Sequence, residues 1–175
     1  MNGDDIIRTA LEGKAKAMAL RPADGQGTAV SRVRLREALT CDVQEGDWKL
    51  VVGMPQSMGG ANAGPTPGAL GRAAFGTCLA VSYGMWAARL GVSLESVEVD
   101  VHADYDARGE LGVSSDIRPG YLEIRYVVRI ESPAPASEVL RVLDTADRCS
   151  TFVDLFANGV PLRREVQIAA SARCA

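Results

Sequence analysis

The stretch that decides the fold reads PGALGRAAFGTCLAVSYGMWAARL and runs from Pro67 to Leu90. Thr66 suits the N-cap of a helix, Pro67 its first position, and Gly91 the position after its last turn. The apolar residues spread around the whole circumference, so most of this helix needs a cover. It would be about 36 Å long. One sheet of so short a chain cannot cover that much apolar surface, and a second copy of the chain is the simplest cover.

Two cysteines stand out by their positions. Cys78 lies inside this apolar helix, and Cys149 closes a second helical pattern that begins at Ser137. A single free thiol in a core helix is usually an inert small hydrophobe. Two thiols on two buried helices, with a Gly- and Pro-rich loop opening the first, indicate redox chemistry at a helix junction. Cys41, on the inward face of a predicted strand, and Cys174, in a frayed tail, need no functional explanation.

The rest of the pattern predicts an α+β fold with antiparallel strands. Residues 1–27 are expected to form an N-terminal helical extension, and residues 28–175 the main part of a single-domain chain. Outside the central helix, the expected elements are a helix over 6–20, a hairpin with strands over 31–43 and 48–52, strands over 97–105 and 122–130, a helix over 137–149, and a last strand over 162–168.

Charge and hydropathy exclude several classes of protein. The chain has 175 residues and a net charge of −3, without the basic face typical of nucleic-acid binders. Arg32, Arg34 and Arg36 alternate along one predicted strand and are interpreted as a solvated face. The longest uncharged run, 73–88, is shorter than the roughly 20 residues that span a bilayer. The N-terminus is acidic and lacks an export signal, so we expect a cytoplasmic protein that binds neither nucleic acid nor membrane.

The sequence offers no recognisable metal or cofactor motif. The single histidine, His102, lies on the polar face of a predicted strand, where an exposed residue is the simplest interpretation. One histidine without a Cys-x-x-Cys pair makes no zinc ligand set. The loop over 59–68 lacks both the Gly-Lys-Ser/Thr end of a phosphate loop and the Gly-x-Gly-x-x-Gly pattern. We therefore expect neither a metal nor a cofactor.

One longer match carries more information. The run GGANAGPTPGALGRAAFGTC from Gly59 to Cys78, followed by Cys149-Ser150, resembles the osmotically induced protein C / organic hydroperoxide resistance (OsmC/Ohr) family. The similarity covers residues 28–170. It implies an intertwined homodimer in which two long central helices pack between antiparallel curved sheets, with two sites at the subunit interface. Cys78 would be the peroxidatic thiolate and Cys149 the resolving thiol, and a dihydrolipoyl protein or a small thiol would reduce their disulfide.

Two positions depart from the family pattern. Gly68 stands where active members carry a glutamate, and Ser150 stands where a proline usually follows the second cysteine. The family glutamate orients an arginine that stabilises the thiolate, and Arg32, Arg34 and Arg36 are the candidates for that arginine. The resemblance therefore implies a slow thiol peroxidase that reduces organic hydroperoxides, an antioxidant in an oxidative stress response.

Two other functions stay open. A non-peroxidatic member of the family would bind an apolar small molecule in the same interface pocket, and a purely structural dimeric module would do neither. For a functional pocket, the expected apolar walls are Phe75, Leu79, Tyr83 and Phe152. If the two thiols form a redox pair, the Cα atoms of Cys78 and Cys149 lie within about 7 Å of each other.

Overall fold

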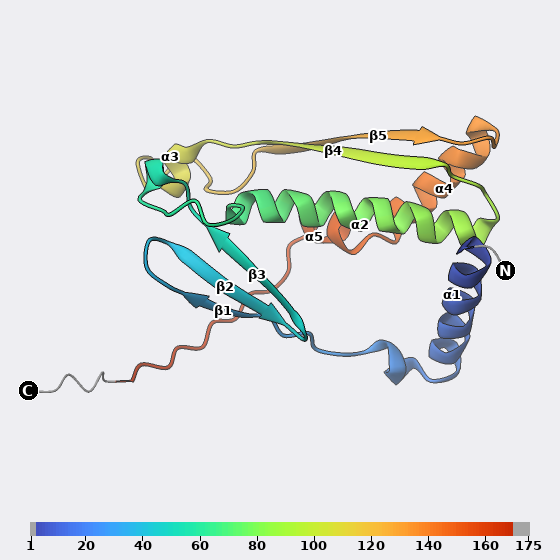
Figure 1. Ribbon diagram of the computed structural model, residues 1–175, viewed down its shortest axis with the longest axis horizontal. Coiled ribbons are helices and arrows are strands. Elements are labelled where there is room, and N and C mark those ends of the chain that lie inside the picture. The colour runs from blue at the N-terminus through green and yellow to red at the C-terminus, as the bar shows by residue number, and fades with distance from the viewer. Residues whose placement is uncertain (1–2, 170–175) are drawn as a thin grey trace, which may run out of the picture.

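The fold is that of a computed structural model, which describes residues 3–169 (Figure 1). Helix α2 (Pro67–Leu90) runs through its centre. Both ends of this helix follow the prediction: Thr66 Oγ1 accepts a hydrogen bond from Ala69 N at 3.1 Å, and Gly91 takes a φ of +70° in the left-handed region. The hydroxyl satisfies an otherwise unpaired amide, and glycine adopts the left-handed turn without steric cost.

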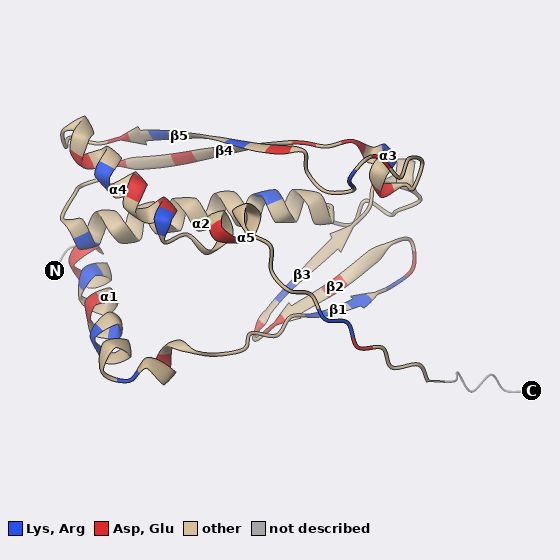
Figure 2. Cartoon of the chain, turned by 180° about the vertical axis from the view of Figure 1, so that it is seen from behind, with Lys and Arg blue, Asp and Glu red and all other residues tan. Residues whose placement is uncertain are grey.

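A long two-stranded ribbon lies along α2 (Figure 1). It consists of β4 (Ser96–Asp104) and β5 (Glu123–Glu131), which pair antiparallel, and the short helix α3 (Ala107–Glu110) lies in the connection between them. Its inner face carries alternating apolar residues that pack against α2, as the period of two predicts. Those residues are Val97, Val99, Val101, Ile124 and Val128. Acidic and basic residues follow one another along this ribbon in Figure 2, and His102 in β4 is exposed, as expected.

Two helices complete the core. Helix α4 (Ala136–Arg148) packs against α2 through Val142 and Ala146, which are fully buried. Helix α5 (Thr151–Ala157) follows after a break at Cys149 and Ser150, and Ser150 Oγ caps it by accepting from Val153 N at 3.3 Å. The sequence interpretation missed α5, although a serine followed by apolar residues is a recognisable helix start.

The N-terminal strands form a three-stranded meander instead of the expected hairpin. Its strands are β1 (Arg32–Leu35), β2 (Thr40–Glu45) and β3 (Trp48–Gly53). The predicted strand over 31–43 is wrong because the chain turns between β1 and β2, where Ala38 and Leu39 take positive φ angles of 49° and 48°. This turn lacks the Gly, Asn or Pro that usually marks one. The meander extends away from α2 in Figure 1.

The loop between β3 and α2 is held against the end of the meander. It begins with a short 3-10 helix, η2 (Gln56–Met58). A Cβ added at Gly60 would lie 1.9 Å from the Met54 carbonyl oxygen, and one at Gly64 would lie 2.2 Å from the Val51 carbonyl oxygen. Only glycine allows the backbone so close. The loop thereby fixes the start of α2.

The predicted last strand over 162–168 is wrong. Residues 158–169 form no helix or strand, and Leu162 and Ile168 are 95% and 92% exposed. A strand needs a neighbouring strand to satisfy its backbone groups. Neither of the two sheets in residues 3–169 pairs with this segment. The alternation of apolar residues was therefore an insufficient signal.

The predicted N-terminal helix is present as α1 (Gly3–Leu20). None of its residues is buried within the described chain. It stands at the C-terminal end of α2 (Figure 1) and is followed by the short 3-10 helix η1 (Pro22–Gly25). No helix in residues 3–169 is long and apolar enough to cross a membrane.

Two apolar surfaces are left uncovered by residues 3–169. On α2, one stripe carries exposed side chains at helical spacing, including Leu70, Val81 and Met85 at 36%, 55% and 37% exposure. On the meander, cross-strand pairing places one set of apolar residues on a single face. This face includes Val33, Leu35, Val43, Trp48 and Leu50. Trp48 is 80% exposed.

Candidate active site around Cys78

Cys78 lies in the middle of α2 with a half-buried side chain. Its Sγ is 3.7 Å from Ser150 Oγ, at the junction between α4 and α5. Ser150 is only 3% exposed, and its Oγ also accepts from Val153 N. The predicted thiol at the helix junction is therefore in place, and its polar neighbour is a buried hydroxyl.

Cys149 is the residue beside that hydroxyl, but its side chain is exposed. It ends α4 as the C-cap residue, with its N–H donating to the Ala146 carbonyl at 3.0 Å. Within residues 3–169, Cys41, Cys78 and Cys149 are all free thiols. The fold thus places the segment 149–150 next to Cys78. Ser150, rather than Cys149, is the residue that contacts the Cys78 side chain. Cys174 lies outside the described residues.

A network of hydrogen bonds to one half-buried carboxylate, Asp147, holds this junction. Asp147 Oδ1 accepts from Tyr83 OH at 2.8 Å, and Oδ2 accepts from Tyr126 OH at 3.1 Å. The Asp147 carbonyl accepts from Ser150 N at 3.2 Å. Burial, followed by the bond to Asp147, raises the pKa of Tyr83 well above its ordinary value of 10.0. Burial and the Asp147 charge also raise the pKa of Tyr126. Both phenols therefore stay protonated donors, and α2, β5 and α4 are linked through one carboxylate.

Arg72 lies beside Gly68, and sequence reasoning missed this arginine. Arg72 Nη1 donates to Tyr121 OH at 3.2 Å, and Tyr121 OH donates to the Gly68 carbonyl at 3.0 Å. A Cβ at Gly68 would make ordinary contacts, 3.5 Å from Arg72 Nη1 and from Tyr121 OH. The i, i+4 spacing of Gly68 and Arg72 was the available signal. A carboxylate at position 68 would lie beside this guanidinium.

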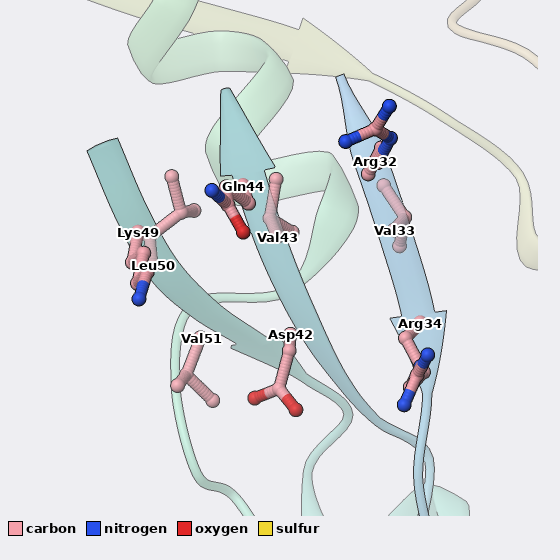
Figure 3. A pocket seen from close by; sticks show the side chains of 9 residues that line it. All are labelled: Arg32, Val33, Arg34, Asp42, Val43, Gln44, Lys49, Leu50 and Val51. Carbon is pink, nitrogen blue, oxygen red and sulfur yellow. The ribbon is translucent and has the colours of Figure 1, made fainter. Parts of the chain in front are cut away.

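The three candidate arginines lie in the meander. Arg32 and Arg34 line a hollow of about 820 Å³ on its surface (Figure 3), together with residues of β2 and β3. Arg36 Nε pairs with Asp42 Oδ2 at 2.8 Å, and both side chains are about half exposed. Among residues 3–169, none of these three arginines forms a hydrogen bond with Cys78.

An aromatic hollow opens one helical turn before Cys78. Phe75 stacks edge-on against Tyr126 and Phe156, with ring centroids 5.5 and 5.3 Å apart. These rings line a space of about 500 Å³ that Arg118 and residues of β5 also border. Of the expected pocket walls, Phe75 lies at this hollow and Phe152 packs beside it. Leu79 and Tyr83 are fully buried in the chain's own core, so their expected role as walls is wrong.

The described residues contain no group of three or more His, Cys, Asp or Glu side chains that could hold a metal ion. The reactive groups that the structure brings together around Cys78 are thiols, a hydroxyl and a hydrogen-bonded carboxylate. A thiolate at Cys78 would be a nucleophile in a partly dry environment, with a hydroxyl donor beside it and a second thiol in the adjacent residue.

Comparisons with known proteins identify relatives. The sequence profile of the family described as OsmC-like protein matches residues 59–165. No curated protein sequence matches the chain. An OsmC-like protein from Mycoplasma pneumoniae superposes with a TM-score of 0.66 at 13% identity, covering 77% of this chain and 90% of that one.

Two solved structures carry names that refer to organic hydroperoxides. The organic hydroperoxide resistance protein OsmC of Legionella pneumophila matches with a TM-score of 0.52 at 17% identity, covering 73% of this chain and 88% of that chain. The organic hydroperoxide resistance protein OhrB of Bacillus subtilis matches with a TM-score of 0.51 at 15% identity, covering 76% of this chain and 93% of that chain. At these identities the structural likeness establishes the fold alone.

Proposed function

Because this chain belongs to the OsmC-like family, we propose that it is a thiol peroxidase that reduces organic hydroperoxides through Cys78 and Cys149. The observation that carries the proposal is the half-buried Cys78 thiol against the segment 149–150, with a second free thiol at Cys149. The hydroperoxide resistance proteins among the structural neighbours support the same substrate class.

The proposed reaction has two steps. The Cys78 thiolate attacks one oxygen of the hydroperoxide, the O–O bond breaks, and the leaving alkoxide takes a proton from water to become an alcohol. Cys78 is then a sulfenic acid. The Cys149 thiol attacks its sulfur, water leaves, and a disulfide remains. An external thiol or dithiol reduces that disulfide and restores both thiols. Cys149, exposed at the end of α4, must turn toward Cys78 in the second step.

The proposed working form is a homodimer. The stripe of α2 and one face of the meander both expose apolar side chains to solvent. Exposed apolar patches of this kind mark interaction surfaces, and each of the two could cover the other. If the meander of one subunit covers α2 of its partner, both are buried in one contact. Arg32 and Arg34 alternate with Val33 and Leu35 along β1, so in this contact they would lie on the other face of the meander.

A second candidate function has its own support. The aromatic hollow beside Phe75 suits an apolar small molecule, since aromatic and aliphatic side chains form much of its wall. A family member that only binds such a ligand would need no reactive Cys78.

Free-thiol titration separates the two functions. The purified protein is treated with an organic hydroperoxide, with hydrogen peroxide as a comparison, and its thiols are counted before and after. A peroxidase loses the Cys78 and Cys149 thiols together and prefers the organic substrate, while Cys41 persists. Cys78→Ser abolishes the loss, and Cys149→Ser leaves a sulfenate that a dimedone-type reagent traps. Unchanged thiol counts and no trapped sulfenate in Cys149→Ser would decide for ligand binding.

A further inference from the structure

We infer that Ser150 is a catalytic residue: its hydroxyl donates a hydrogen bond to the Cys78 thiolate and stabilises that nucleophile. The inference deepens the proposed function by naming the group that activates Cys78. It starts from one contact, the 3.7 Å between Cys78 Sγ and Ser150 Oγ. It concerns a position where the sequence departs from its family.

The direction of this hydrogen bond depends on the charge of the sulfur. A neutral thiol and a hydroxyl can each donate to the other. A thiolate has no proton, so in the charged state the hydroxyl must be the donor. Ser150 Oγ already accepts from Val153 N at 3.3 Å, which uses one lone pair and leaves the O–H proton for the sulfur. Because a bond to an ionised group is the stronger one, the contact favours the thiolate over the thiol.

The surroundings make this bond effective. Ser150 is 3% exposed, so little water competes for its hydroxyl. Its main chain is held by the bond from Ser150 N to the Asp147 carbonyl at 3.2 Å, and the Asp147 carboxylate is held by two tyrosine hydroxyls. The donor is therefore already oriented before the sulfur becomes charged. Preorganised donors of this kind lose little free energy to reorganisation.

The charged side chains on α4 and α2 have other hydrogen-bond partners than the Cys78 sulfur. On α4, Asp147 is bound by Tyr83 and Tyr126, and Arg148 donates to Thr145 Oγ1 at 3.3 Å. On α2, Arg72 donates to Tyr121. Among residues 3–169, Ser150 Oγ is the hydrogen-bond partner of the Cys78 sulfur.

The test measures thiol reactivity directly and needs no hydroperoxide. The full-length protein is treated with iodoacetamide across a pH series, and the modification rate of the Cys78 peptide is read by mass spectrometry. Replacing Ser150 by Ala lowers the modification rate at neutral pH about tenfold, as expected for a lost bond to a charged group. Ser150→Thr, which keeps the hydroxyl, restores the wild-type curve.

Two further variants separate this effect from the loss of a helix cap. Ser150→Gly removes the hydroxyl while retaining a residue tolerated at an N-cap, and it shifts the curve as Ser150→Ala does. Thr66→Ala removes the cap of α2, far along the chain from Ser150, and leaves the curve unchanged. The inference is overturned if Ser150→Ala and Ser150→Gly match wild type, or if Thr66→Ala shifts the curve equally. A shifted curve in a protein that consumes no hydroperoxide would overturn the peroxidase proposal and retain only the hydrogen bond from Ser150 to the Cys78 thiolate.

Discussion

At the scale of single residues, Gly68 is the departure with the clearest consequence. The structure leaves room for a side chain there, 3.5 Å from Arg72 Nη1. Sequence comparison identified the missing carboxylate, but it could not identify Arg72 as the nearest cation. That neighbour follows from the helical register of α2 and from the position of Tyr121, which belongs to a distant segment.

Gly68→Glu is expected to increase the rate of hydroperoxide consumption several-fold and to stabilise the fold by roughly 0.5 kcal/mol. The new carboxylate can pair with an arginine, and it lies in the first turn of α2, where the helix dipole favours negative charge. The rate is measured with an organic hydroperoxide and a thiol reductant, and stability by urea unfolding. Gly68→Gln is the matched control, with similar size and no charge. Equal rates in the two variants would contradict the electrostatic explanation.

Tyr83 carries a second prediction at this scale. Its pKa is raised in the folded state, so its bond to Asp147 contributes fully below the unfolded value of 10.0. As the pH rises beyond that value, the unfolded state ionises first. Stability then falls by up to about 1.4 kcal/mol per pH unit for this one group.

Urea unfolding at pH values on both sides of 10.0 checks this. Tyr83→Phe should unfold at lower urea than wild type at neutral pH, by about 1–2 kcal/mol, because Asp147 loses a donor. It should also lose less stability as the pH rises. Tyr105→Phe, at a site that is 65% exposed, is the control and should leave both quantities unchanged. Identical alkaline slopes in wild type and Tyr83→Phe would refute the assignment.

At the scale of elements, local signals predicted α2 well because its cap, its first proline and its final glycine are adjacent in sequence. The β1–β2 turn was missed because Ala38 and Leu39, which rarely take positive φ angles, make it. The predicted strand over 162–168 failed for a different reason. Period-two alternation describes a side-chain pattern, whereas a strand also requires a backbone partner. The junction between α4 and α5, which positions Ser150, depends on tertiary contacts with α2.

The exposed stripe of α2 carries a prediction about assembly. Val81 is 55% exposed in the single chain, and the proposed dimer buries it. Val81→Asp would place a charge in that apolar contact and is expected to convert the dimer to monomers at micromolar concentration, as measured by light scattering. Val127→Asp is the matched control, since Val127 is 44% exposed on the outer face of β5. A Val81→Asp protein that elutes and scatters like wild type would remove α2 from the interface.

At the scale of the whole molecule, the α+β architecture and the family were both predictable from the sequence, because the central helix and its cysteine carry a recognisable pattern. Two sets of contacts join residues that are far apart in the sequence, and no local sequence pattern predicts them. Ser150 meets Cys78, and Asp147 meets Tyr83 and Tyr126. These contacts determine which residue faces the thiol. The two uncovered apolar surfaces belong to the same scale, since only the folded structure shows that the described part of one chain leaves them exposed.

The central claim is that Cys78 is oxidised by a hydroperoxide and that Cys149 resolves it. Peptide mapping by mass spectrometry tests this most directly, after exposure to an organic hydroperoxide and blocking of the remaining thiols. The account predicts a disulfide-linked pair of peptides containing Cys78 and Cys149, with Cys41 blocked as a free thiol. Cys78 recovered as a fully blocked free thiol, with the hydroperoxide unconsumed, would contradict it.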